Sequence, residues 1–231
     1  MGYHSIIYIF LFLPVCLLAY QLAPEKWRGR VLLAFSWIFF YLLSGKLLVY
    51  LLGTTLLTHC IGIWLTLLKT EEAKAVEGMD RKQKKVIKAE YQKKGRRVLI
   101  LGILILLGVL GYLKYFDFFT TNLSYLFGHP VLEGWRPEKL LMPIGISFYT
   151  LQAIGYMTDV YWGTIQAETE IWRTALFLGF FPQIMEGPIA RYSDVAGTLY
   201  TGKPLEYRNV VDGYVRIFWG LFKKMVIADR M

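Results

Sequence analysis

Long apolar runs alternate with short charged segments along this chain of 231 residues. Asp, Glu, Lys and Arg are all absent from residues 1–24, 31–45, 47–68, 98–113 and 140–158. Because a helix rises about 1.5 Å per residue, the run 47–68 is long enough to cross a hydrocarbon core of about 30 Å, and the shorter runs can do so by tilting. The pattern predicts an all-α fold, a polytopic transmembrane helical bundle that forms a single integral membrane region over residues 1–231.

Charge predicts how this bundle is oriented. Residues 69–97 hold 11 Lys and Arg against 5 Asp and Glu, which supplies +6 of the net charge of +9. The positive-inside rule places this segment and the basic loop 23–30 on the cytoplasmic side, with the N-terminus outside. We expect Ser5–Leu22 to be a retained span, because no Lys or Arg precedes it as in a secretory signal.

The basic segment 69–97 is interpreted as a cytoplasmic loop or an interfacial helix that contacts membrane lipids. A charge run between two spans is usually a solvated surface facing the lipid head groups. Nucleic acid is therefore not an expected partner.

The second half of the chain has apolar stretches that are polar or broken at membrane depth. Leu140–Thr158 contains Ser, Thr and Gln, which predicts a helix that faces protein or a cavity rather than lipid. The stretch Thr174–Met185 is interrupted by Pro182 and followed by Gly187-Pro188, so its helix would cover only about half of the membrane core. Backbone groups freed at that depth need polar partners, and we expect a substrate tunnel to supply them. The candidate tunnel residues are Ser147, Gln152, Asp159, Gln183, Glu186 and Arg191. For Asp159 and Arg191, interfacial anchoring is an equally open interpretation.

No catalytic or metal-binding residue is predicted from the residues alone. The three histidines, His4, His59 and His129, have no second ligand at metal-binding spacing, and His59, inside an apolar run, is expected to bond to a neighbouring helix. Ser147 does not form a nucleophile elbow, because Tyr149 stands where that motif needs Gly. Cys16 and Cys60 both lie in apolar runs, so no disulfide is argued. The last stretch, Val210–Met231, is amphipathic. This pattern predicts either an interfacial helix or a helix packed in the bundle with its polar stripe in contact with water.

Three stretches resemble the membrane-bound O-acyltransferase (MBOAT) family. They are Pro143–Gly163 (PIGISFYTLQAIGYMTDVYWG), Phe181–Tyr192 (FPQIMEGPIARY) and Gly220–Asp229 (GLFKKMVIAD), and the shorter segments Phe10–Pro14 and Lys114–Phe118 agree with them. The branch that they resemble contains the alginate O-acetyltransferases and the D-alanyl-lipoteichoic acid transferases.

This resemblance implies a partial MBOAT-type ring of short, tilted and broken helices in the cell membrane, with multiple passes. The implied reaction moves an acyl group, acetyl or D-alanyl, from a cytoplasmic thioester donor onto hydroxyls of an envelope polysaccharide or a teichoic acid. The implied partners are acyl-CoA, an acyl carrier protein or a partner membrane protein, together with the envelope polymer, and no cofactor is expected.

The family's presumed general base is an intramembrane histidine in the half of the protein that follows these motifs. Neither His4, His59 nor His129 occupies that position, so the resemblance implies the N-terminal half of an acyltransferase, inactive by itself. The alternative from the residues is a polytopic transporter or a noncatalytic membrane scaffold, in which broken helices around a cavity are equally expected. A transporter often carries internal repeats, and we find none here.

Overall fold

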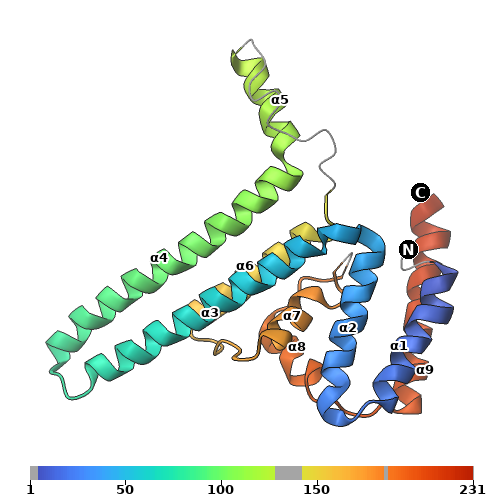
Figure 1. Ribbon diagram of the computed structural model, residues 1–231, viewed down its shortest axis with the longest axis horizontal. Helices are drawn as coiled ribbons and strands as arrows, with labels where there is room; N and C mark the ends of the chain where they lie inside the picture. The colour runs from blue at the N-terminus through green and yellow to red at the C-terminus, as the bar shows by residue number, and fades with distance from the viewer. Residues whose placement is uncertain (1–4, 128–141, 185–186, 231) are drawn as a thin grey trace.

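The computed structural model describes residues 5–127, 142–184 and 187–230, and these residues form helices without any strand. The all-α prediction is confirmed. Their bounds are α1 Leu13–Leu22, which continues a π-helical turn Tyr8–Phe12, α2 Glu25–Ser44, α3 Leu48–Val76, α4 Arg81–Lys114, α5 Phe116–Phe127, α6 Ile146–Trp162, α7 Ile171–Gly179, α8 Tyr192–Leu199 and α9 Tyr207–Phe222. A π turn, Lys223–Ile227, and a 3₁₀ turn, Ala228–Arg230, extend α9. Figure 1 shows their arrangement.

Helices α3 and α4 form a long hairpin, which extends to the left in Figure 1. Of the two structures predicted for 69–97, a loop or an interfacial helix, the segment is helical: both helices run through it, and only residues 77–80 turn the chain. Two local features explain the turn, since Gly78 takes φ +76° and the Asp80 side chain accepts a hydrogen bond from the backbone N–H of Arg81, where α4 begins. Lys, Arg, Gln, Glu and Ala, which dominate the segment, are all good helix formers.

Two helical stretches, Glu25–Val76 and Arg81–Lys114, are long and apolar enough to cross a membrane. The first comprises α2 and α3, which meet at the bend around Gly45, where φ is +56°. In their most apolar windows only 22% and 28% of the residues are buried. Large side chains such as Val49 and Leu104 are more than half exposed, which suits contact with lipid. Tyr8–Leu22 is a shorter apolar helix.

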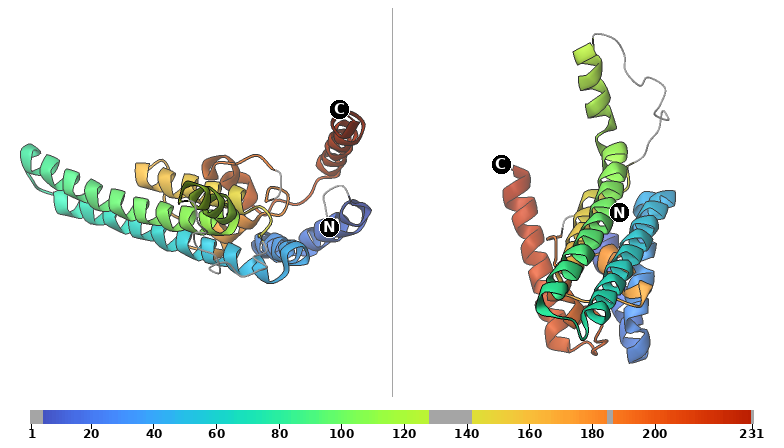
Figure 2. Two further views of the ribbon diagram at one scale, coloured as in Figure 1. Left: turned by 90° about the horizontal axis from the view of Figure 1, so that it is seen from above. Right: turned by 90° about the vertical axis from the view of Figure 1, so that its left-hand side faces the viewer.

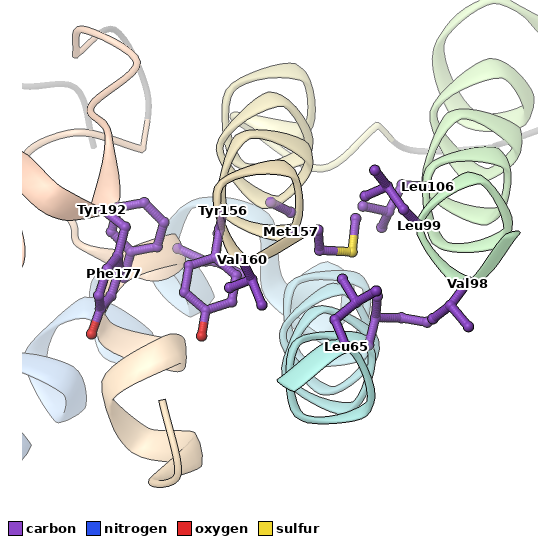
Figure 3. Packing of buried hydrophobic residues seen from close by; sticks show 12 residues of the cluster. Leu65, Val98, Leu99, Leu106, Tyr156, Met157, Val160, Phe177 and Tyr192 are labelled. Atoms are coloured by element: carbon purple, nitrogen blue, oxygen red, sulfur yellow. The ribbon is translucent and has the colours of Figure 1, made fainter. Parts of the chain in front are cut away.

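The main core lies where α6 packs against both helices of the hairpin. Figure 3 shows Met157 of α6 between Leu65 of α3 and Leu99 of α4. Small residues allow this close approach, because a Cβ placed on Gly102 would lie 3.2 Å from the Met157 sulfur, and one on Gly62 3.2 Å from the Tyr156 ring. Helix α7 packs against α2 and α3.

Helix α7 is short, as the proline and glycine pattern predicts. Its nine residues rise about 14 Å, roughly half of a membrane core. After α7 ends, the backbone N–H of Phe181 donates to the Ser36 hydroxyl of α2 over 3.3 Å, so a side chain from another helix satisfies a backbone donor in the segment that follows α7. The Phe181 ring packs on Tyr8, Phe12 and Phe39, so the segment that follows α7 is in contact with the N-terminal helices.

Helix α9 lies apart from the main core. Figure 2 shows it to one side of the hairpin and α6. It approaches the N-terminal segment, with the Phe10 and Phe218 ring centroids 6.4 Å apart. The prediction of an amphipathic helix over Val210–Met231 is confirmed as far as residue 230, and the helix begins three residues earlier, at Tyr207.

Candidate functional site

A carboxylate, an arginine and three tyrosines form a polar cluster beside the core. We call it the Glu168 cluster; its members are Tyr156, Glu168, Arg173, Tyr192 and Tyr200. Glu168, between α6 and α7, donates its backbone N–H to the Tyr156 hydroxyl over 2.8 Å, and its carboxylate accepts a hydrogen bond from the Tyr192 hydroxyl. The other carboxylate oxygen lies 3.5 Å from a terminal nitrogen of Arg173. Because the Glu168 side chain is only 18% exposed, these partners compensate for the water that the carboxylate loses.

Aromatic rings hold this cluster in place. Tyr192, the first residue of α8, makes edge contacts with the rings of Tyr156 and Phe177, with centroids 5.1 Å away in both cases, and Figure 3 shows the three side chains together. Tyr200 donates its hydroxyl to the Arg173 carbonyl over 2.7 Å. Burial raises the pKa of Tyr192, and its bond to Glu168 raises that pKa further, so the hydroxyl stays protonated and remains a donor at neutral pH.

His59, in the middle of α3, faces Thr174 of α7. Its Nδ1 lies 3.3 Å from the Thr174 hydroxyl, so the prediction that His59 bonds to a neighbouring helix is confirmed. The Thr55 and Thr58 hydroxyls on the same helix donate to backbone carbonyls one turn earlier, over 2.8 and 2.7 Å. Their hydroxyl protons are therefore engaged within α3. His4 and His129 lie outside the described residues.

Ser147 lies at the start of α6, and the turn that contains Gln183 packs against the residue just before this helix. Ser147 accepts a hydrogen bond from the Lys114 ammonium at the end of α4 over 3.0 Å. Gln183 lies in the turn 181–184, which packs directly on Gly145. Gly145 has φ +74°, and a Cβ there would overlap the Ile184 carbonyl oxygen. The contact needs glycine at this position, since any side chain would push the turn away.

Gln152 lies further along α6 and is buried without a partner for its amide nitrogen. The Tyr149 hydroxyl, one helical turn earlier on the same face, is also buried and unpaired among the described residues. Buried donors without partners are rare in native proteins and each calls for an explanation, such as a ligand. Tyr149 is not among the residues predicted from the sequence, although its spacing of three from Gln152 could have shown that the two share a face.

The remaining tunnel candidates lie elsewhere. Asp159 belongs to the last turn of α6, about 18 Å along the helix from Ser147, and is half-buried. Arg191 is exposed just before α8, and Glu186 lies outside the described residues. The described candidates are therefore spread along α6 and its surroundings and do not meet at one point.

The sequence reasoning missed the Glu168 cluster. Glu168 lies in the polar connection between two apolar stretches. Charged residues are common in such connections, so its presence there does not indicate a site. Its partner Tyr192 is 24 residues away, and only the packing of α8 against α6 and α7 brings them together.

Comparisons with known proteins agree along the whole chain. It is 30% identical over 231 residues to the probable alginate O-acetylase AlgI of Pseudomonas aeruginosa, covering all of this chain and 40% of that protein. It is 29% identical to the AlgI protein of Azotobacter vinelandii over 233 residues, covering 42% of it. The peptidoglycan O-acetyltransferase of Helicobacter pylori is 27% identical over 263 residues, with 98% of this chain and 44% of that protein covered. No family model and no solved structure matches.

The chain matches the N-terminal part of an MBOAT-type O-acetyltransferase. The predicted resemblance is thereby confirmed. The chain spans about two fifths of the length of these relatives. Because the alignments cover the chain from end to end, the Glu168 cluster and the unpaired groups of α6 both lie within the matched region.

Proposed function

We propose that this chain forms part of a membrane-bound O-acyltransferase that moves an acyl group from a cytoplasmic thioester onto hydroxyls of a cell-envelope polymer. The observation that carries the proposal is the match over the whole chain to relatives named for O-acetylation of two different polymers, alginate and peptidoglycan. Those names favour acetyl over D-alanyl as the group transferred, and an envelope polysaccharide over a teichoic acid as the acceptor. They also favour transfer over the transporter or scaffold alternative.

The reaction needs a base and hydrogen-bond donors for the carbonyl oxygen, and residues of α6 would supply the donors. A polymer hydroxyl attacks the thioester carbonyl and loses its proton to a base, and the thiolate departs as the ester forms. Negative charge develops on the carbonyl oxygen during the attack, so donors held ready for that oxygen lower the barrier. The unpaired Tyr149 hydroxyl and Gln152 amide are two such donors, on one face of a helix and shielded from water.

The base is proposed to be none of the three histidines of this chain. The family resemblance places the base in a later part of the enzyme than His59, whose Nδ1 is bonded to Thr174. His59→Ala in the complete gene product should keep most of the activity, and the 231-residue chain alone should have none. Loss of more than about a hundredfold in His59→Ala, at normal abundance, is the effect of removing a general base and would contradict this assignment.

The membrane arrangement supports separate entry for the two substrates. We propose a multi-pass protein of the cell membrane, with the basic half of the α3–α4 hairpin in the cytoplasm, where the donor, acyl-CoA or an acyl carrier protein, is available. A partner membrane protein could pass the acyl group on instead. The polymer acceptor would approach from the outer side, near the start of α6, where Ser147 and Gln183 lie.

The test uses Tyr149→Phe and Gln152→Leu in the complete gene product, produced in cells that make the polymer. Acetate and D-alanine released from the polymer by mild base are measured separately, which identifies the acyl group. If these groups stabilise the oxyanion, each variant loses about a hundredfold in rate. Since each substitution removes an unpaired buried donor, the midpoint of thermal unfolding should stay the same or rise.

Matched controls are Tyr207→Phe and Gln166→Leu, which make the same chemical changes at exposed positions. They should keep the parent's rate. Unchanged transfer in Tyr149→Phe and Gln152→Leu would refute the role of α6, whereas absence of any base-labile acyl group on the polymer in cells with the unaltered protein would refute the function itself.

A further inference from the structure

A cavity of about 650 Å³ lies between α3, α4 and the last turn of α6, away from the residues proposed for transfer. Its lining has two kinds of surface. Leu65 and Leu68 contribute apolar surface, which we call the apolar floor, and four residues contribute charged and amide groups: Lys69, Glu72, Lys88 and Gln92. Tyr91, Tyr161 and Trp162 also line the cavity. A cavity of this size and mixed lining is typical of a small-ligand site.

The cavity lies at the level where the hairpin changes from apolar to basic. The uncharged run of α3 ends at Leu68 and that of α4 begins at Val98, and the two helices are in contact at this level through Leu65 and Gly95. Beyond it, residues 69–97 carry a net charge of +6. Tyrosine and tryptophan are enriched at the boundary between lipid and water, and two of them close α6 at this point. The cavity floor therefore lies at acyl-chain level and its polar part at head-group level.

Lys69 is held in a fixed position at this boundary. Its ammonium donates to the Val160 carbonyl over 2.8 Å and so caps the C-terminal end of α6. Two further protons of that ammonium remain for a ligand. Lys88, across the cavity on α4, is exposed. The two ammonium groups and the surrounding positive charge favour an anion, while the Glu72 carboxylate can accept hydrogen bonds from hydroxyl groups.

We propose that this cavity binds an anionic phospholipid with a hydroxylated head group, of the phosphatidylglycerol type. Its phosphate lies between Lys69 and Lys88, its head-group hydroxyls bond to Glu72, and the first part of its acyl chains packs on Leu65 and Leu68. A soluble phosphate compound would use only the polar half of the lining. The apolar floor at membrane level is the feature that favours the lipid.

The proposal is tested by native mass spectrometry of the 231-residue chain in detergent with added lipids. Phosphatidylglycerol should form a one-to-one adduct that phosphatidylcholine does not displace. Lys88→Gln should weaken this adduct about fivefold, since one basic residue near an anionic head group contributes about 1 kcal/mol. Lys93→Gln removes the same charge from the same helix but from outside the cavity, and should leave the affinity nearly unchanged.

A second variant tests the cavity without changing any charge. Ala73 lines the cavity and Ala89 does not, so Ala73→Phe should block the adduct while Ala89→Phe should not. Retention of folding is checked by circular dichroism. Equal losses in Lys88→Gln and Lys93→Gln would show attraction by overall charge only, and full binding by Ala73→Phe would exclude the cavity; either result overturns the proposal.

A competition experiment distinguishes the lipid from a soluble phosphate ligand. Glycerophosphoglycerol, the head group without acyl chains, should compete only weakly at millimolar concentration, because it cannot use the apolar floor. Complete displacement of the lipid by this head group would mean that the site recognises a soluble phosphate compound instead, and would also overturn the proposal.

Discussion

The bond between Glu168 and Tyr192 should stabilise the fold measurably, because it joins α8 to the α6–α7 connection. Tyr192 is buried, and its hydroxyl donates to a carboxylate that is 18% exposed. Hydrogen bonds to charged groups contribute about 1.5–3 kcal/mol when they are shielded from water. The ion pair between Glu168 and Arg173 adds less, because its 3.5 Å distance is long and Arg173 is more than one third exposed.

A double-mutant cycle isolates this bond. Tyr192→Phe keeps the ring contacts with Tyr156 and Phe177 and removes only the hydroxyl, while Glu168→Ala removes the acceptor. We expect the free energy of unfolding to fall by about 2 kcal/mol in either variant and the two losses to overlap, with a coupling energy of about 1–2 kcal/mol. Unfolding is followed by tryptophan fluorescence in mixed micelles with increasing dodecyl sulfate.

The control cycle uses the pair Glu90 and Lys94 on α4. Its nitrogen and oxygen are 2.9 Å apart, shorter than the Glu168–Arg173 pair, but both side chains are about half exposed or more. It should show no measurable coupling, since water and salt screen exposed pairs. A Glu168–Tyr192 coupling below about 0.3 kcal/mol would mean that the two sites act independently and that the cluster does not hold α8 in place.

Three further predictions follow from other parts of the molecule. Gly145→Ala should lower the free energy of unfolding by about 2 kcal/mol or more, because alanine is strained at positive φ and its methyl would overlap Ile184. Gly155→Ala, in open space within α6, should be neutral or stabilising, and similar results for both variants would contradict this account. Orientation in the membrane is tested in a variant without Cys16 and Cys60, treated on intact cells with an impermeant thiol reagent. The reagent should label Tyr125→Cys of α5 but not Gln83→Cys at the hairpin tip, and the reverse labelling would contradict the proposed topology. Arg191→Ala and Gln183→Ala in the complete gene product should lower the transfer rate with little change in protein abundance or thermal stability. If both variants keep the wild-type rate, or lose activity only in proportion to lost protein, residues 183–191 have a structural role and do not line the tunnel.

The sequence by itself determined where helices form and where they break. Runs without charge marked the apolar parts of α2, α3, α4 and α6, since that signal is local and depends only on composition. Pro182 marked the region where α7 could not continue, because proline lacks the donor that a helix needs, and α7 ends at Gly179, three residues before it. For residues 69–97 the sequence left a loop and an interfacial helix open. The structure has helix on both sides of a turn at residues 77–80, in agreement with the helix propensity of these residues.

Only the tertiary structure decided which polar groups meet. The sequence predicts that His59, inside an apolar run, forms a hydrogen bond to a neighbouring helix. The packing of α7 against α3 decides that its partner is Thr174. The unpaired state of Gln152 and Tyr149, the bond between Ser147 and Lys114, and the Glu168 cluster all depend on how α6 sits between its neighbours. Periodicity tells which face of a helix is apolar, but the rotation and register of two packed helices come from side chains distant in sequence, and small residues such as Gly62 and Gly102 allow the close packing that fixes them.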